Sequence, residues 1–296
     1  MTVVADEQVL IGTAATISAQ FLDQDGDLAE PAGTVTVGIV DEAGATVVAA
    51  GTATTTGSTG VRTYTLSAAA TSTTRNLVAT WTNGTTSTTT RTEVVGGYYA
   101  SVRTIRESDP VLEDPRKYPA AQVVAARRAV EREFEDFCAV AFVPRYRRVR
   151  LDGTGRTEIV LPDSELRTVR SVREYDSDGN YEAYTAPELA AIPASRSGVA
   201  VRTDGELWEK GRANVVVEYE HGYDRPPTDV LEAFFLRVRD VLNRSNRGVP
   251  DRATTFTSDV GGTYSLLVAG RGGSITGIPD VDVVLKRYSR RIPGIA

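Results

Sequence analysis

In the stretch "YEHGYDRPPTDVLEAFFLRVRDVLNRSNRG", from Tyr219 to Gly248, a strand is expected to give way to a helix. An alternating apolar pattern leads into it and indicates a strand, which ends at Gly222. Pro226-Pro227 suits the start of a helix, and Gly248 suits its C-cap. One side of this expected helix is apolar, at Val230, Phe234, Val238 and Val241. The stretch therefore predicts a domain that mixes sheet and helix.

Upstream, a second amphipathic helix is expected directly after Pro119 and is ended by Pro144. Its apolar stripe consists of Val123, Val130, Phe134 and Phe137. The charged residues Arg127, Arg128, Glu131, Arg132 and Glu135 fall mostly on the other face. Alternation and turn residues then predict strands at 145–151, 156–161, 166–174, 181–185, 198–202 and 213–220. A short helix, "DVDVVLKRYSRR", closes the chain.

The first 96 residues differ in composition from the rest of the 296-residue chain. They hold nine acidic residues and three arginines, so they carry the whole net charge of −6. Apolar residues alternate at period two in "AATISAQF", "TVTVGIV" and "NLVATW", and Asn83-Gly84 is a strong hairpin signal. We therefore expect an N-terminal all-β, immunoglobulin-like sandwich at 1–96, a proline-rich linker at 97–118, and an α+β domain at 119–296.

No motif carries chemistry with any specificity, so we expect no enzyme, catalytic site, cofactor or metal. Cys138 is the only cysteine, which excludes an internal disulfide and a cysteine-based zinc site. The only histidine, His221, has no nucleophile or second ligand nearby, and a structural role is expected. Asp23, Asp25 and Asp27 faintly resemble a calcium loop but lack its glycine and its distal glutamate. A solvated loop is the better interpretation there, with a cation site as the open alternative.

Targeting segments are not expected either. No apolar run reaches the roughly 18 residues of a membrane span, and the sequence begins without a basic region followed by an apolar core.

Three ordered segments resemble the head-to-tail adaptor (connector) proteins of long-tailed bacteriophages. The first is "DPRKYPAAQVVAARRAVEREFEDFCAVAFVPRYRRVRLDGTGRTEIVLPDSELRTVRSV". The second is "VVVEYEHGYDRPPTDVLEAFFLRVRDVL", a strand, Gly-Tyr, proline and helix in that order. The third is the closing "IPDVDVVLKRYSRR". The resemblance covers about 104–296, so residues 1–96 are an addition to the compact family core.

The resemblance implies a structural protein of the virion, assembled in the host cytoplasm. Subunits of the family form a closed ring, typically of twelve, between the portal and the stopper or tail. Genomic DNA would pass through the ring without sequence-specific binding. Two alternatives stay open at this point. One is a surface adhesin or carbohydrate-binding protein built on the immunoglobulin-like domain, and the other is an enzyme that uses scattered carboxylates.

The resemblance also places the C-terminal helix against the portal. Apolar residues recur at i, i+3, i+4 and i+7 on one face of this helix. The predicted portal contact comprises Val281, Val284, Leu285, Arg287, Tyr288, Arg290, Arg291 and Ile292. The alternative is that this apolar stripe packs on its own domain. The Gly-rich segment 249–279 is expected to become ordered only against a neighbouring subunit or tail protein.

Overall fold

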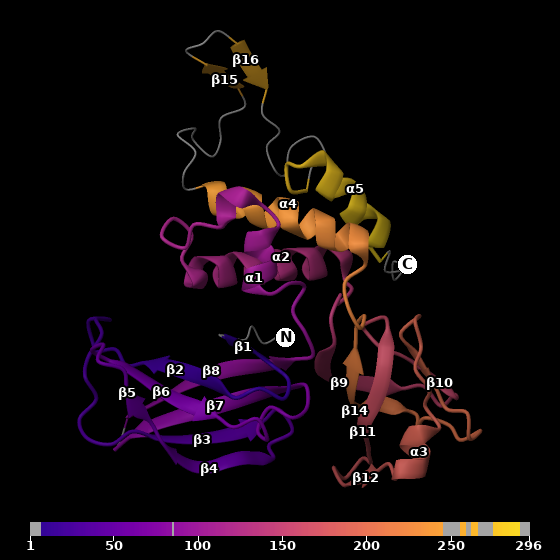
Figure 1. Ribbon diagram of the computed structural model, residues 1–296. Helices are drawn as coiled ribbons and strands as arrows, with labels where there is room; N and C mark the ends of the chain where they lie inside the picture. The colour runs from indigo at the N-terminus through magenta and orange to yellow at the C-terminus, as the bar shows by residue number, and fades with distance from the viewer. Residues whose placement is uncertain (1–6, 85, 245–254, 259–261, 266–274, 291–296) are drawn as a thin grey trace. The chain divides into compact units, whose positions relative to one another are not determined.

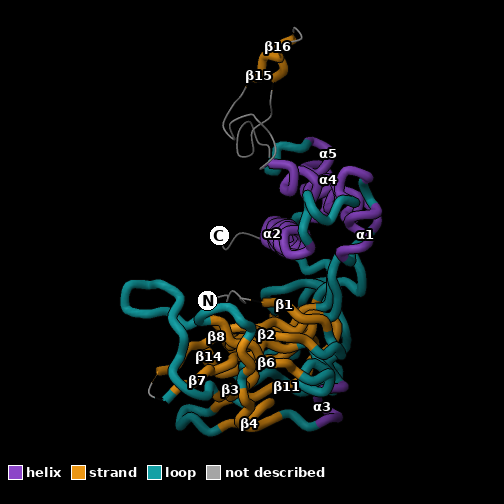
Figure 2. The backbone as a smooth tube through the Cα atoms, turned by 60° about the vertical axis from the view of Figure 1, so that its left-hand side comes forward, coloured by secondary structure: helices purple, strands orange, loops and turns teal. Residues whose placement is uncertain are grey.

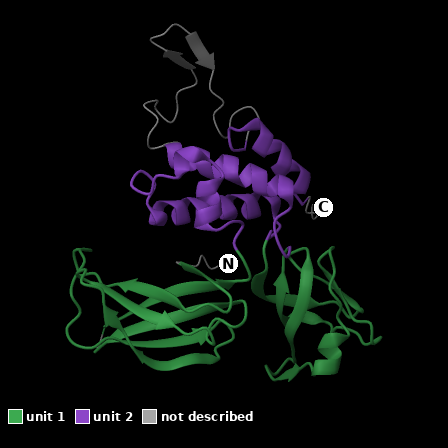
Figure 3. Ribbon diagram, viewed as in Figure 1, with its two compact units in different colours: residues 1–97, 143–222 green, residues 98–142, 223–296 purple. Residues whose placement is uncertain are grey.

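The computed structural model describes residues 7–84, 86–244, 255–258, 262–265 and 275–290. The chain mixes α and β structure, with several sheets and few helices (Figure 1). It divides into two compact units, which Figure 3 shows in green and purple. Unit 1 joins residues 1–97 to 143–222, and unit 2 joins residues 98–142 to 223–296. Both units are therefore discontinuous in sequence, whereas the sequence suggests consecutive domains.

The N-terminal part of unit 1 is built from two sheets. The first has the strand order β1-β8-β7-β3-β4, and the second has the order β2-β6-β5. Pairing is antiparallel except between β1 and β8, which run parallel. The strand bounds are β1 Glu7–Leu10, β2 Ala15–Gln20, β3 Thr36–Asp41, β4 Thr46–Thr52, β5 Thr54–Thr55, β6 Val61–Leu66, β7 Arg75–Asn83 and β8 Thr86–Val95.

One apolar core lies between these two sheets. Ile17 comes from β2 and Leu66 from β6, while Ile39 and Trp81 come from the other sheet, and all four are at most 1% exposed. The Trp81 indole N–H donates to the Thr90 hydroxyl at 2.9 Å, so its polar atom is satisfied as well. The alternating runs of the sequence thus point their apolar side chains into a β-sandwich.

The remainder of unit 1 is a second strand system. A four-stranded antiparallel sheet has the order β12-β11-β14-β9, and β10 pairs with β13. The bounds are β9 Arg145–Gly153, β10 Glu158–Val160, β11 Leu166–Tyr175, β12 Tyr181–Ala183, β13 Val199–Val201 and β14 Gly211–His221. A short helix, α3 (Ala186–Ala190), begins with a capping box formed by Thr185 and Glu188 and was not expected from the sequence. Trp208, Val217 and Tyr219 are fully buried on one face of the sheet.

Polar contacts join the sandwich to this sheet within unit 1. The Glu220 carboxylate pairs with Arg170 at 2.6 Å and accepts from the Thr74 hydroxyl of the sandwich at 3.0 Å. Arg145 lies 3.4 Å from Glu93 of β8. The sandwich and the four-stranded sheet of unit 1 are therefore linked by hydrogen bonds and ion pairs between largely buried side chains.

Unit 2 is mainly helical (Figure 2). Its elements are α1 Val102–Glu107, the 3-10 turn Pro110–Leu112, α2 Ala120–Cys138, α4 Thr228–Arg244, β15 Thr255–Ser258, β16 Gly262–Ser265 and α5 Pro279–Tyr288. The segment expected as a linker is packed here, because Ile105, Leu112 and Tyr118 are at most 1% exposed. The C-cap expected at Gly248 lies outside the described residues, as does most of segment 249–279.

Helix α2 buries more than its apolar stripe. Val123, Val130 and Phe134 are fully buried as expected; Phe137 is 37% exposed, while the neighbouring Cys138 is fully buried. The expected solvated face is also partly covered, since Arg127 and Glu131 are 5% and 1% exposed. The cause is the segment that leads into α1. Tyr99 donates its backbone N–H to Glu131 at 2.8 Å, and the Tyr98 ring lies 3.6 Å from the Arg127 guanidinium.

Candidate functional site

The C-terminal helix α5 is the site that the sequence singles out, and its apolar stripe packs within unit 2. Val281 and Leu285 are fully buried, and Val284 and Tyr288 are partly buried. The Tyr288 hydroxyl and the Arg287 guanidinium both bind Asp229 of α4, at 2.9 and 2.8 Å. The exposed side of α5 instead carries Val283, which is 60% exposed, and Lys286. Arg291 and Ile292 lie outside the described residues.

A buried carboxylate fixes the start of α5. Asp282 is 5% exposed and accepts hydrogen bonds from the Thr276 backbone N–H and hydroxyl, at 2.8 and 2.7 Å. Arg237 of α4 donates to the Thr276 carbonyl at 3.1 Å and pairs with Glu133 of α2 at 2.7 Å. Burial lowers the pKa of Arg237, but the hydrogen bond and charge of Glu133 outweigh it and raise the pKa. These contacts tie α5 to α4 and α2.

Aromatic residues from distant parts of the chain meet beside this helix. The Phe142 ring stacks on Tyr223 with centroids 5.8 Å apart, and meets Tyr288 edge-on at 5.6 Å. Next to them, the backbone N–H of Arg290 donates to the Cys138 carbonyl at 2.9 Å. Burial raises the pKa of the Cys138 thiol to about 12, so this thiol stays protonated and packs as a small apolar group. The ends of α2 and α5 and the start of the α4 segment therefore converge at one cluster.

His221 closes strand β14 and is buried, at 8% exposure. Its Nε2 lies 3.8 Å from the Asp163 carboxylate, which also accepts a hydrogen bond from the Tyr219 hydroxyl. Burial lowers the pKa of His221, and the Asp163 charge opposes that shift only in part. The imidazole is therefore neutral at pH 7, and it packs beside the Tyr219 ring with the ring centroids 5.7 Å apart.

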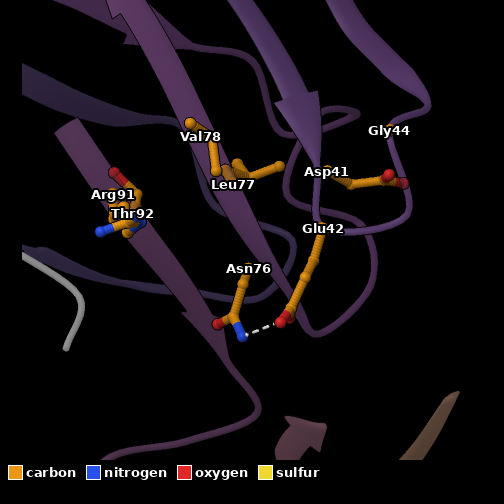
Figure 4. Close-up of a pocket in the computed structure, with 8 residues that line it drawn as sticks. All are labelled: Asp41, Glu42, Gly44, Asn76, Leu77, Val78, Arg91 and Thr92. Atoms are coloured by element: carbon orange, nitrogen blue, oxygen red, sulfur yellow. Dashed lines mark hydrogen bonds between the residues drawn. The ribbon is translucent and has the colours of Figure 1, made fainter. Parts of the chain in front are cut away.

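A small cavity of about 230 Å³ lies in the sandwich (Figure 4). The Asn76 amide donates to the Glu42 carboxylate at 2.9 Å, and Asp41 accepts from the backbone N–H groups of Ala43 and Ala45. Ligand sites usually measure 300 Å³ or more, and both acidic groups already serve turn and strand contacts. The lining residues are Asp41, Glu42, Gly44, Asn76, Leu77, Val78, Arg91 and Thr92.

The acidic loop at 23–27 is organised by its own backbone. Asp23 accepts the backbone N–H groups of Asp25 and Asp27, both at 2.9 Å. Across residues 7–290, outside the gaps named above, no three His, Cys, Asp or Glu side chains gather as a metal site would need. No helix in the described part of the chain is long and apolar enough to cross a membrane.

One surface feature was missed by the sequence reasoning. The register of the sheet places Arg148, Arg150, Arg173, Tyr175 and Tyr181 on the face opposite the Val217 core, and we name this set the arginine–tyrosine face. The signal was present in "RYRRVR", where arginines recur at period two at 148 and 150. The arginine–tyrosine face could not be predicted from the sequence, because its residues come from three strands, β9, β11 and β12, whose pairing only the structure gives.

Comparisons with known proteins give the following. No family model matches this chain, and no curated protein matches it. Among solved structures, a chain from the neck of an empty gene transfer agent (GTA) particle computed with C6 symmetry has 16% identity and a TM-score of 0.43, covering 66% of this chain and 93% of its own. A chain from the virion of the native GTA particle gives the same four values. A chain from the neck of the native particle computed with C12 symmetry has 18% identity and a TM-score of 0.41, covering 67% and 97%. Scores at this level carry no functional argument on their own, because a shared arrangement does not imply a shared function.

Proposed function

We propose that this protein is a structural component of the neck of a phage-like virion, namely the head-to-tail adaptor that forms a ring between the portal and the stopper or tail. The observation that carries the proposal is the convergence of the three adaptor-like segments. The first segment contains Phe142, the second Tyr223 and the third Tyr288, and the Phe142 ring packs against both tyrosine rings in unit 2. Rings up to 146 positions apart in the chain, at Phe142 and Tyr288, thus pack in one cluster, which is what a shared core of the three segments requires.

A ring of about twelve subunits follows from the resemblance, with DNA passing through it without sequence-specific contacts. Ring closure needs a heterologous contact, in which two different surfaces of neighbouring copies meet. The neck structures named above are described with sixfold and twelvefold symmetry, and those descriptions belong to those particles.

The N-terminal sandwich is, on this proposal, an immunoglobulin-like module added to the adaptor. Strands β8, β7, β3 and β4 pair in the order of strands G, F, C and C′, and β2, β6 and β5 pair in the order B, E and D. Polar contacts attach this module to the second sheet, because Glu220 binds Thr74 and Arg145 binds Glu93 of the sandwich.

The portal contact is proposed on the outer side of α5. Val284, Arg287, Tyr288 and Arg290 keep part of their surface exposed, and Arg291 and Ile292 follow them in the sequence. Val281 and Leu285 support this contact from inside the unit by holding the helix in place.

The test of the function is reconstitution with the portal ring of the same particle. The full chain should co-purify with the portal, and negative-stain images should show an added ring coaxial with it. Arg287→Glu should weaken this binding, whereas Arg103→Glu, an equal change at a residue 87% exposed on α1, should not. A full chain that never binds portal rings, at any ratio, would refute the proposed function.

A further inference from the structure

The arginine–tyrosine face presents positive charge that the chain itself leaves largely uncompensated. The Arg150 guanidinium lies 4.9 Å from the centre of the Tyr175 ring, and Arg173 lies 5.1 Å from that of Tyr181. The two rings lie 5.5 Å apart. Stacking orients a guanidinium without neutralising it. Arg150 and Arg173 form no ion pair with any carboxylate in the described parts of the chain, while Arg148 pairs with Glu218 at 3.3 Å.

The end of the face that carries Arg150, Arg173 and Tyr181 is accessible, whereas Glu220, on the same face of β14, contacts Thr74 of the sandwich. Tyr181 is 54% exposed and Arg150 is exposed, while Arg173 and Tyr175 are partly exposed. The opposite face of the same sheet is fully covered by its own core, where Val217 and Tyr219 are completely buried. A sheet face with aromatic rings and outward guanidinium groups is suited to a partner that is acidic and partly apolar.

The sandwich of the same chain carries a surface with those properties. In the loop from Leu22 to Leu28, three carboxylates at 23, 25 and 27 form no ion pair within the described residues. Leu22 and Leu28 bridge one another and are 59% and 46% exposed, which is unusual for such large apolar side chains. The loop therefore offers negative charge flanked by apolar side chains, and it belongs to the third of the chain that carries the whole net charge of −6.

We propose that the arginine–tyrosine face docks the acidic Leu22–Leu28 loop of a second copy of this chain. The carboxylates of Asp25 and Asp27 would face the guanidinium groups, and the two leucines would pack on the tyrosine rings. The two surfaces differ, so the contact is head-to-tail, and it forms a ring when the rotation between neighbouring copies closes. This inference rests on the proposed function for the closure of the ring, but it requires no portal.

Duplex DNA is the other anionic partner that such a face could attract. Phosphates would satisfy the arginines, but they would leave the exposed leucines of the acidic loop without a role. A second copy accounts for both surfaces at once, and for their opposite charge.

The test is a charge exchange in the full chain, read by sedimentation velocity and native mass spectrometry over a range of concentrations at low salt. Arg150→Glu with Arg173→Glu reverses the face, and Asp25→Lys with Asp27→Lys reverses the loop. Each double variant should self-associate at least roughly 100-fold more weakly than the natural chain, because like charges then oppose each other. An equimolar mixture of the two should regain assembly, because each variant presents the surface that the other needs.

Matched controls carry equal charge changes elsewhere. Arg156→Glu with Arg196→Glu alters two exposed arginines off the face, and Glu113→Lys with Glu206→Lys alters two exposed acids. Both should assemble like the natural chain. Circular dichroism verifies that every variant is folded.

Several results would overturn the inference: a natural chain that stays monomeric throughout, reversed variants that assemble normally, or a mixture that does not recover. Loss of binding to a short DNA duplex by the Arg150→Glu, Arg173→Glu variant, with self-association unchanged, would assign the face to DNA instead. Portal-bound rings that both reversed variants still form would leave the adaptor function standing and remove this contact. If the chain assembles in the charge-dependent way described but does not bind the portal, the contact between copies stands and the adaptor function is refuted.

Discussion

Two valines on α5 provide a sharp test of how the C-terminal helix is held. Val281 is fully buried and Val283 is 60% exposed, although they lie two positions apart in the same helix. Alanine at either position removes the same atoms. The accompanying gain in helix propensity, at most about 0.7 kcal/mol, is similar at both and largely cancels in the comparison.

The expected magnitudes follow from burial. At Val281 the loss comprises two buried carbon groups at about 0.8 kcal/mol each and the cavity they leave, which together lower the free energy of unfolding by about 2 to 3 kcal/mol. At Val283 the removed groups already contact water, so the change stays within about 0.5 kcal/mol. The difference between the two variants is therefore the measured quantity.

Urea unfolding of the two variants can be followed with a probe for each unit. Trp81 and Trp208, the only tryptophans, both lie in unit 1, so their fluorescence follows that unit. Far-ultraviolet circular dichroism is dominated by the longer helices α2 and α4 of unit 2. The dichroism midpoint should fall for Val281→Ala and hold for Val283→Ala. Equal effects of the two substitutions, or no effect of either, would refute the packing of α5 and return the whole stripe to the portal contact.

Three further predictions concern unit 1. Burial lowers the pKa of His221 below 6.5, so the unfolded chain binds a proton that the folded chain does not, and stability is lost as the pH falls below about 6.5. His221→Asn should fold and assemble, and its loss of stability on acidification should be smaller by up to about 1.4 kcal/mol per pH unit. An equal loss of unfolding free energy between pH 7 and pH 5 in the variant and the natural chain would contradict this. Glu220→Gln removes the carboxylate that pairs with Arg167 and Arg170 and should lower the free energy of unfolding by about 1 to 3 kcal/mol. The control Glu182→Gln, at an exposed residue, should change it little. Equal urea midpoints for the two variants would show that the Glu220 ion pairs do not stabilise unit 1. Gly198→Ala should lower the melting temperature clearly, because φ is +74° and the new Cβ would lie 2.2 Å from the Asp163 carbonyl oxygen; an unchanged melting temperature would disprove the clash.

Much of the secondary structure could be predicted from the sequence because periodicity reports local geometry directly. The six strands expected between 145 and 220 correspond to β9, β10, β11, β12, β13 and β14, with ends that differ by a few residues. Helices α2 and α4 follow their apolar stripes, and Trp81 and its alternating neighbours point into the sandwich core. The short helix α3 escaped because five residues are too few to show a helical period.

Local patterning along the chain shows which faces are apolar and where the composition changes, whereas contacts between distant residues establish what covers each face. Glu131 looked solvated by its spacing, yet the backbone of Tyr99 crosses over it, a contact made across 32 residues. The same holds for the stripe of α5, whose periodicity fits a partner protein and its own helices equally well until Asp229 and Cys138 are placed beside it. Only strand pairing assembles Arg150, Arg173 and Tyr181 into one charged surface, because period-two patterns orient side chains within a strand and carry no information about the neighbouring strand.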